Sequence, residues 1–498
     1  MSNLDWGVLI VYLALVAGVG AWVGRGQKDS DDFLLGGRSI PWWAALLSLV
    51  ATEISAATFL GAPEQGYRRN LTYLQFAIGS ISARFVLANY FITVYYKAGV
   101  TTVYEFLQNR FGPVTEKTTA FLFLLGRLCA DGSRLFIAAI TIEVVTGFPI
   151  NLSIIILAVV TILYTTAGGI KAVIWTDVVQ AVILVGAGVA LLASLWNQTG
   201  MSFDEVYRQL SDAGKLTLLD TSSNPLTDPY NMFAAVLGGF FLTMATHGTD
   251  HDMVQRLLTC EDDAGSRRST WMSGFVGVGV TALFMGVGLM LWVHLSRLAA
   301  DAPLALKAAE LEAAGKNGHY LLFYTLESLP SGIVGLIVAG VLAAAMSSLS
   351  SAFNAMTATF ISDFYRPMRE GISGKEELLA SRIVTLAFGT LVACLALLVS
   401  DFYHSNPETD LLSLALGIMT IFYGSLLGIF LVALFTKTRG TELGNLAAAV
   451  LSICTVGWVT TTEIAWPWYI VIGTFVSASV SFFSGRTPMK ESQIEEAS

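Results

Sequence analysis

The sequence predicts an all-α polytopic membrane protein with about thirteen transmembrane helices. Of its 498 residues, 54% are hydrophobic and 13% are charged, a composition that fits no soluble class. Apolar runs long enough to cross about 30 Å of hydrocarbon follow one another along the chain. Polar residues interrupt two of these runs, which indicates that the protein does more than anchor itself in a bilayer.

The predicted spans begin near the N-terminus and continue almost to the C-terminus. A leading helix belongs to residues 1–30, two sets of five spans to 42–196 and 232–435, two trailing helices to 441–484, and a tail to 485–498. The individual apolar runs are 6–24, 42–60, 73–96, 119–145, 151–168, 175–196, 232–248, 271–295, 331–360, 379–400, 411–435, 441–461 and 465–484.

The two interrupted spans are the first and the sixth after the leading helix. In the first, Glu53 and a run of Ser and Thr precede Gly61 and Pro63. In the second, the apolar run ends in a group of polar residues around Gly248. Broken helices at matching positions of two halves are the sequence sign of an inverted-repeat secondary transporter with its site at the membrane midplane. The alternative for Glu53 is a protonated, hydrogen-bonded structural acid.

The run 331–360 carries an oxygen-rich face. Ala344, Ser347, Ser348 and Ser351 follow i, i+3, i+4, i+7 spacing, and Ser350 lies beside them. Hydroxyls and carbonyls are hard, neutral ligands that suit a monovalent cation. The alternative is that small residues only allow close helix packing, which explains the alanines better than the serines.

Four arginines fall inside or at the ends of predicted spans: Arg84, Arg127, Arg134 and Arg382. An arginine near the bilayer centre costs at least about 2.5 kcal/mol, so each needs a partner or water. Asp131 lies four residues after Arg127 and three before Arg134, the spacing at which helix neighbours pair. Two interpretations stay open, a structural ion network and substrate binding. Arg382 follows a polar loop, and we expect it to reach the membrane surface.

Loop charges predict the orientation. Of the 28 Lys and Arg residues, 17 lie in loops on one side of the predicted membrane and 7 on the other. The first span has no basic residue before it and Arg25 and Lys28 after it, the reverse of a signal peptide. The positive-inside rule therefore places the N-terminus outside and the C-terminus in the cytoplasm, in a plasma (inner) membrane.

Several functions are not indicated. The four cysteines are widely spaced and predict neither a metal site nor redox chemistry. No P-loop is present, so ATP is not the expected energy source. We expect no enzymatic activity and no nucleic-acid partner. A monomer is compatible with all of these features, and the sequence does not set the oligomeric state.

The chain resembles the sodium:solute symporter family over nearly its full length. The markers are the runs 168–180 and 343–351, the segment Asp252-Met-Val-Gln-Arg256, and the run 51–67. The resemblance implies a LeuT-type inverted repeat of five plus five helices, with one leading and two trailing helices.

The resemblance also implies sodium ligands. Backbone carbonyls of the first broken helix and oxygens of the eighth form the principal site, and in sialic-acid symporters a deeper site adds hydroxyls and an aspartate. One or two Na⁺ ions are therefore expected. The first site falls on Ala51, Ile54, Ala344, Ser347 and Ser348, and the second on Ser350, Ser351 and Asp177.

The family's substrate-binding residues match this chain less completely than its sodium ligands do. The contacts of the sugar transporters fall on Ala77, Gly277 and Thr246, which makes a sugar held in that manner unexpected. Glu53 aligns both with a sialic-acid contact and with a sodium-related aspartate of proline symporters, so cation and substrate roles both stay open. The candidate substrate ligands are Glu53, Ser55, Thr58, Tyr73, Arg127, Asp131, Arg134, Thr246 and His247.

Together these features predict a Na⁺-coupled symporter that imports a small polar solute across the lipid bilayer by alternating access. A carboxylate or zwitterion is the expected cargo, because an arginine could clamp a carboxylate and Glu53 an ammonium group. The alternatives are a sodium-coupled sugar transporter, a serine-lined cation channel and a membrane sensor. Broken helices favour the transporter over the channel.

Overall fold

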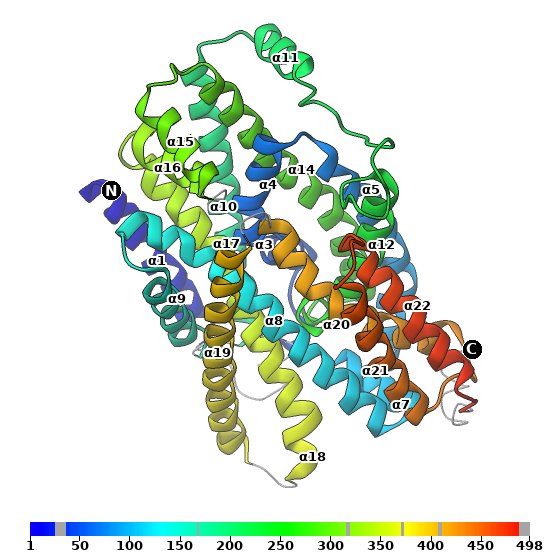
Figure 1. Ribbon diagram of the computed structural model, residues 1–498. Helices are drawn as coiled ribbons and strands as arrows, with labels where there is room; N and C mark the ends of the chain where they lie inside the picture. The colour runs from blue at the N-terminus through cyan, green and yellow to red at the C-terminus, as the bar shows by residue number, and fades with distance from the viewer. Residues whose placement is uncertain (25–35, 167–168, 315–318, 370–372, 407–410, 488–498) are drawn as a thin grey trace.

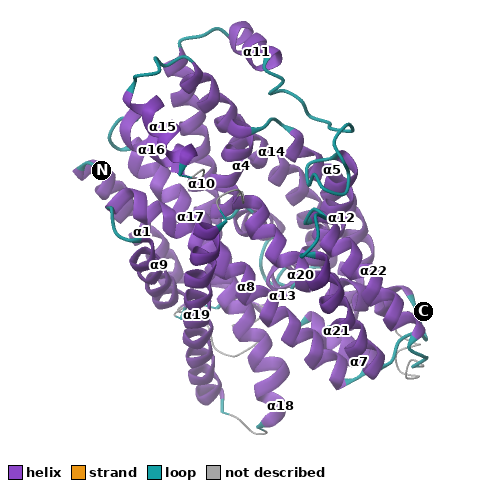
Figure 2. Ribbon diagram, viewed as in Figure 1, coloured by secondary structure: helices purple, strands orange, loops and turns teal. Residues whose placement is uncertain are grey.

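The computed structural model describes residues 1–24, 36–166, 169–314, 319–369, 373–406 and 411–487. Within these ranges the chain is helical, and no β-strand is formed (Figure 2). The predicted loop residues Arg25 and Lys28, the end of the leading segment 1–30, the start of the run 168–180 and most of the tail 485–498 lie outside the described residues.

The helices follow the predicted order (Figure 1). They are α1 Asn3–Gly24, α3 Trp42–Glu53, α4 Ala56–Arg68, α5 Phe76–Val86, α6 Ile92–Ala98, α7 Val103–Phe111, α8 Pro113–Thr146, α9 Ile150–Thr165, α10 Ile170–Thr199, α11 Phe203–Asp212, α12 Met232–Gly248, α13 His251–Leu258, α14 Asp263–Ser296, α15 Pro303–Ala313, α16 Tyr320–Ser328, α17 Ile333–Thr359, α18 Arg366–Met368, α19 Gly374–Ser405, α20 Leu411–Phe435, α21 Glu442–Val459 and α22 Pro467–Phe483.

The predicted all-helical membrane fold is confirmed, but the predicted number of spans is not. In the described chain, eight helices are long and apolar enough to cross a membrane, or up to eleven if each bent pair is one span. Each predicted range nevertheless overlaps a helix or a bent pair. The difference arises because α22 is short for a span and because α8 and α9, predicted as two spans, form a pair bent by 113°.

Both predicted helix breaks are present. α3 and α4 are bent by 62° at their junction, and α12 and α13 by 58°. Pro63 lies inside α4, where Gly288 of α14 allows the two backbones to touch, because a Cβ atom at Gly288 would overlap Pro63. A small residue thus lets α14 pack directly against the broken helix at Pro63.

α17 forms the centre of the bundle. In the most apolar part of Ile333–Met368, 89% of the residues are buried. It packs against α10, α8, α1, α19 and α3. The leading helix also caps α17, because a carboxylate oxygen of Asp5 accepts hydrogen bonds from the backbone N–H groups of Gly332 (2.7 Å) and Gly335 (2.9 Å). The chain therefore places its serine-rich helix in its interior and not against lipid.

Candidate sodium and substrate sites

The break after α3 frees backbone oxygens. Ile54 leaves the helical conformation (φ −84°, ψ 80°), and the N–H of Ser55 donates to the Glu53 carbonyl at 3.1 Å. The Ala51 carbonyl therefore lacks the helix partner that Ser55 would have supplied. Carbonyls at the C-terminal end of a helix also carry the negative end of its dipole, which favours a cation.

Two serines of α17 meet these carbonyls. The hydroxyl of Ser347 donates to the Ala51 carbonyl at 2.8 Å, and that of Ser348 donates to the Thr52 carbonyl at 3.0 Å. Both hydroxyls also lie close to the Ala344 carbonyl, at 3.2 and 3.1 Å. Four of the five residues predicted for the first sodium site are thus brought together, in a buried cluster of neutral oxygens.

The fifth predicted ligand, Ile54, is the residue at which the helix breaks, and its carbonyl stays a predicted ligand. The Thr52 carbonyl, which was not predicted, accepts the hydrogen bond from Ser348. The side-chain hydroxyl of Thr52 is also buried, and it has no hydrogen-bond partner in the described chain. Sequence spacing did not single out Thr52, because the angle at which α3 meets α17 decides which carbonyl of the last turn faces the serines.

The residues predicted for a second sodium site lie on α10 and α17. Asp177 is fully buried, and one of its oxygens accepts from Ser48 at 2.6 Å and from Arg256 at 3.4 Å. Its other oxygen has no hydrogen-bond partner in the described chain. The hydroxyls of Ser350 and Ser351 donate to carbonyls of their own helix, at 3.4 and 2.9 Å, and no described hydrogen bond joins them to Asp177.

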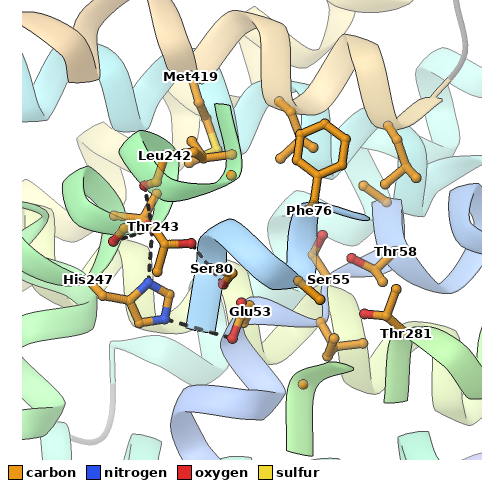
Figure 3. A pocket seen from close by; sticks show the side chains of 18 of the residues that line it. Glu53, Ser55, Thr58, Phe76, Ser80, Leu242, Thr243, His247, Thr281 and Met419 are labelled. Carbon is orange, nitrogen blue, oxygen red and sulfur yellow. Dashed lines mark hydrogen bonds and ion pairs between the residues drawn. The ribbon is translucent and has the colours of Figure 1, made fainter. Parts of the chain in front are cut away.

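A cavity of about 160 Å³ opens beside the two helix breaks. Figure 3 shows Glu53, Ser80 and His247 grouped on one side of it, and Ser55, Thr58 and Thr281 on the other. Of the predicted substrate ligands, Asp131 does not line the cavity. The predicted residues that do line it are Glu53, Ser55, Thr58, Tyr73, Arg127, Arg134, Thr246 and His247.

Arg84 forms a polar cluster in the cavity wall that the sequence did not reveal. One guanidinium nitrogen lies 2.6 Å from Glu53 and 3.1 Å from Nε2 of His247. Because Nε2 faces an N–H donor, it acts as the acceptor, and Nδ1 donates to the Thr246 hydroxyl at 2.9 Å. Ser273 accepts a further hydrogen bond from Arg84 at 3.2 Å. The Glu53–Arg84 pair is electrically neutral, so a substrate ammonium group at Glu53 would share the carboxylate with Arg84.

The two arginines of α8 have different surroundings. Arg127 is 1% exposed and lies 3.5 Å from Asp131, 3.0 Å from Asp250 and 2.5 Å from Asp252. Three carboxylates thus compensate its charge, although one of its guanidinium nitrogens has no hydrogen-bond partner in the described chain. Asp250, which lines the cavity, was not among the predicted site residues.

Arg134 keeps donors available to the cavity. It lies 3.3 Å from Asp131, and a second guanidinium nitrogen contacts the sulfur of Met419 at 3.5 Å. A thioether is a weak acceptor, so a carboxylate oxygen would be a better partner for this nitrogen. Arg134 can therefore bind an anion by exchanging a weak acceptor for a strong one.

Broken helices that meet a buried cluster of oxygens and a polar cavity are typical of secondary transporters. The family model of the sodium:solute symporter family matches residues 33–451, and the chain belongs to that family.

Similar proteins agree with this assignment. The sodium/sialic acid symporter of Aliivibrio fischeri is 26% identical over 100% of this chain and 96% of its own length. The mouse sodium-coupled monocarboxylate transporter 1 is 31% identical over 90% of this chain and 72% of its own length. Among solved structures, an outward-open, substrate-bound Na⁺-coupled sialic acid symporter has a TM-score of 0.85 at 23% identity, covering 98% of this chain and 99% of that one.

The expected class of function is thereby confirmed. The chain is an integral membrane protein of the LeuT type and a Na⁺-coupled symporter, not an enzyme, with Na⁺ as the coupling ion and a small molecule as its cargo.

Proposed function

We propose that this symporter carries a small organic carboxylate and that Arg134 binds the carboxylate group. The observation that carries the proposal is the weak partner of Arg134 at the cavity surface, the Met419 sulfur at 3.5 Å. A planar guanidinium binds a carboxylate with two parallel hydrogen bonds, which a thioether cannot match. The principal sodium site, proposed on Ala51, Ile54, Ala344, Ser347 and Ser348 with the Thr52 carbonyl beside them, adjoins the cavity at the break that follows α3.

The remainder of the cavity supports a cargo without an ammonium group. Glu53 is balanced by Arg84 at 2.6 Å, so the cavity offers no unpaired carboxylate on that side. Apolar side chains, among them Phe76, Leu242 and Leu416, line much of the wall. A carboxylate attached to a mainly apolar body fits this combination better than a zwitterion. The similarity to a sodium-coupled monocarboxylate transporter agrees with this choice.

A sugar fits the cavity less well. The positions at which the family's sugar transporters place an acid and a lysine are Ala77 and Gly277, and both line the cavity. Neither side chain can hydrogen-bond a hydroxyl group, and unpaired sugar hydroxyls would lose their hydrogen bonds to water on entry.

The cargo can be tested with a matched series. In the presence of Na⁺, propanoate and 2-hydroxypropanoate should raise the melting temperature of the purified protein, whereas alanine and glucose at the same concentration should not. The ammonium group of alanine meets no free carboxylate, and glucose has no carboxylate for Arg134. Replacing Na⁺ by K⁺ should remove the stabilisation. Stabilisation by glucose that exceeds that of every carboxylate would contradict the proposal.

We also propose a second sodium ion at Asp177, Ser350 and Ser351. The support is the buried oxygen of Asp177 that has no described partner, since a buried carboxylate oxygen favours a cation beside it. The serine hydroxyls could turn from their own helix carbonyls to the ion. The alternative is that Asp177 only guides the first ion on its way to the cytoplasm and the serines only pack.

Charge movement separates one sodium from two. With a monocarboxylate anion as cargo, two Na⁺ ions move one net positive charge inward per cycle, whereas one Na⁺ moves none. We therefore expect carboxylate uptake to produce an inward current and to rise sigmoidally with Na⁺ concentration. In Asp177→Asn the current per carboxylate should fall toward zero. Uptake without current in the unmodified protein would contradict the proposed second sodium ion, but it would not contradict the first.

For the topology, we propose that the N-terminus is outside and the C-terminus cytoplasmic, with 42–196 and 232–435 as the inverted repeats. The support is the excess of basic residues in alternate loops and the position of the two breaks, at the first helix of each set. The leading segment 1–30 and the trailing segment 441–484 then flank the repeats.

A further inference from the structure

A series of buried ion pairs leads away from the substrate cavity. It begins at Arg134 in the cavity wall, which lies 3.3 Å from Asp131. Asp131 lies 3.5 Å from Arg127 on the next turn of α8. Arg127 then contacts the break between α12 and α13, at 3.0 Å from Asp250 and 2.5 Å from Asp252. The pairs therefore connect the substrate helix α8 to the second broken helix.

The series continues to the candidate second sodium site. Arg256 of α13 lies 2.7 Å from Asp252 and 3.4 Å from Asp177 of α10, and it also donates to Ser48 at 2.9 Å. Each charge in the series thus has a neighbour of opposite sign within hydrogen-bonding or ion-pair distance. We call this set the charge relay, and its members are Arg134, Asp131, Arg127, Asp250, Asp252, Arg256 and Asp177.

The charge relay has an excess of negative charge. It contains three arginines and four aspartates, and all seven residues are buried. One oxygen of Asp131, one oxygen of Asp177 and one nitrogen of Arg127 have no hydrogen-bond partner in the described chain. An uncompensated charge in a low-dielectric interior is costly, so the set as it stands favours one added monovalent cation. The partnerless oxygen of Asp177 is where such an ion can be received.

We propose that the charge relay couples Na⁺ binding at Asp177 to carboxylate binding at Arg134. A cation beside Asp177 competes with Arg256 for that carboxylate, so Arg256 pairs more strongly with Asp252. Asp252 is then a weaker partner for Arg127. In each step, a charged group weakens its ion pair with one neighbour and strengthens its ion pair with another neighbour that it already contacts. No buried charge therefore lacks an oppositely charged partner at any stage.

The same exchange reaches the cavity. As Asp252 turns to Arg256, Arg127 turns to Asp131, and Asp131 releases Arg134 to the substrate carboxylate. Sodium therefore strengthens carboxylate binding, and by thermodynamic reciprocity the carboxylate strengthens sodium binding to the same extent. This inference rests on the proposed function, in which Arg134 binds the carboxylate and Asp177 the second ion.

Geometry distinguishes the charge relay from a network that only stabilises the fold. A network that only stabilises the fold does not require one more aspartate than arginine, nor a partnerless Asp177 oxygen beside a candidate ion site. It would also leave no reason for Arg134 to face the cavity with a thioether as its second partner. Both ends of the charge relay are incomplete, and each end lies at a candidate ligand site.

The middle of the charge relay can be altered without touching either site. Asp252→Asn removes one charge at almost constant volume, and Asp252 does not line the cavity. In the unmodified protein, we expect Na⁺ to tighten propanoate binding by about fivefold or more. In Asp252→Asn, we expect the ion at Asp177 to contribute less than about twofold to this effect, and any remaining effect comes from the principal sodium site. The control is Asp363→Asn, a buried carboxylate hydrogen-bonded to Thr102 at 3.1 Å outside the charge relay, where the coupling should stay unchanged.

A second measurement does not depend on the folding of Asp252→Asn. Arg134→Gln removes a positive charge from one end of the charge relay, so without any substrate it should bind Na⁺ at least about twofold more tightly than the unmodified protein. A side chain that only contacts substrate would not change Na⁺ affinity in that condition. Unchanged coupling in Asp252→Asn, or unchanged substrate-free Na⁺ affinity in Arg134→Gln, would overturn the charge relay.

The two levels of the proposal fail differently. If the unmodified protein binds no carboxylate in Na⁺, the proposed function is wrong and the charge relay with it. If carboxylate binding depends on Na⁺ but does not respond to either substitution, the charge relay alone is wrong.

Discussion

Replacing Arg134 by Gln is expected to abolish carboxylate binding while leaving the protein folded. Removing one partner of a buried, hydrogen-bonded charge pair costs about 2 to 5 kcal/mol, which is at least about thirtyfold in affinity. The substitution leaves Asp131 with Arg127 as its remaining partner at 3.5 Å, so the network inside the protein persists. Binding of propanoate by calorimetry, together with the elution profile of the detergent-purified variant, measures both parts of the expectation.

Two further variants serve as controls for Arg134. Met419→Leu removes the thioether contact at nearly constant volume and should leave carboxylate affinity within a few fold. Arg127→Gln should instead lower the yield of folded protein, because it leaves Asp250 and Asp252 buried without their partner. Full carboxylate affinity in Arg134→Gln would contradict the proposed clamp.

Replacing Ser348 by Ala is expected to weaken the apparent affinity for Na⁺ by about tenfold or more. The substitution removes a neutral oxygen that contacts the Thr52 and Ala344 carbonyls, and a hydrogen bond or ligand to a charged group contributes about 1.5 to 3 kcal/mol. No bulk is added, so the packing of α17 is preserved. Sodium titration of propanoate uptake in vesicles measures the change.

The matched control lies on the same helix. Thr357→Ala also removes one buried hydroxyl from α17, but that hydroxyl bonds Thr385 of α19 at 2.9 Å, away from the carbonyls of α3. Sodium dependence should therefore be unchanged in Thr357→Ala. If Ser348→Ala shows the same sodium dependence as the unmodified protein, the principal sodium site has been placed on the wrong residues.

Local sequence patterns predicted the helix breaks and the shared face of the α17 serines well. The polar run around Glu53 and the residues around Gly248 end helices within a few positions, so the breaks at α3–α4 and α12–α13 could be read directly from the chain. Ser347 and Ser348 share a face because helix periodicity alone places them there. Both features depend on residues close in sequence.

Pairings between distant segments were not accessible in the same way. Arg84 and Glu53 lie 31 residues apart, and Arg127 and Asp252 lie 125 apart, so no spacing rule connects them. The sequence identified Arg84, Arg127 and Arg134 as buried charges that need partners, but helix packing decides which partner each finds. That packing surrounds Arg127 with three carboxylates but gives Arg134 a thioether as its second partner, and it places the Thr52 carbonyl beside Ser348.

The most direct test of sodium-coupled carboxylate transport is uptake of radiolabelled propanoate into proteoliposomes that contain only this protein. An inward Na⁺ gradient should drive saturable accumulation above the external concentration, and an equal K⁺ gradient should not. Collapsing the Na⁺ gradient should release the accumulated propanoate. Equal, non-saturable entry with either cation would indicate a channel-like pathway and would contradict the account.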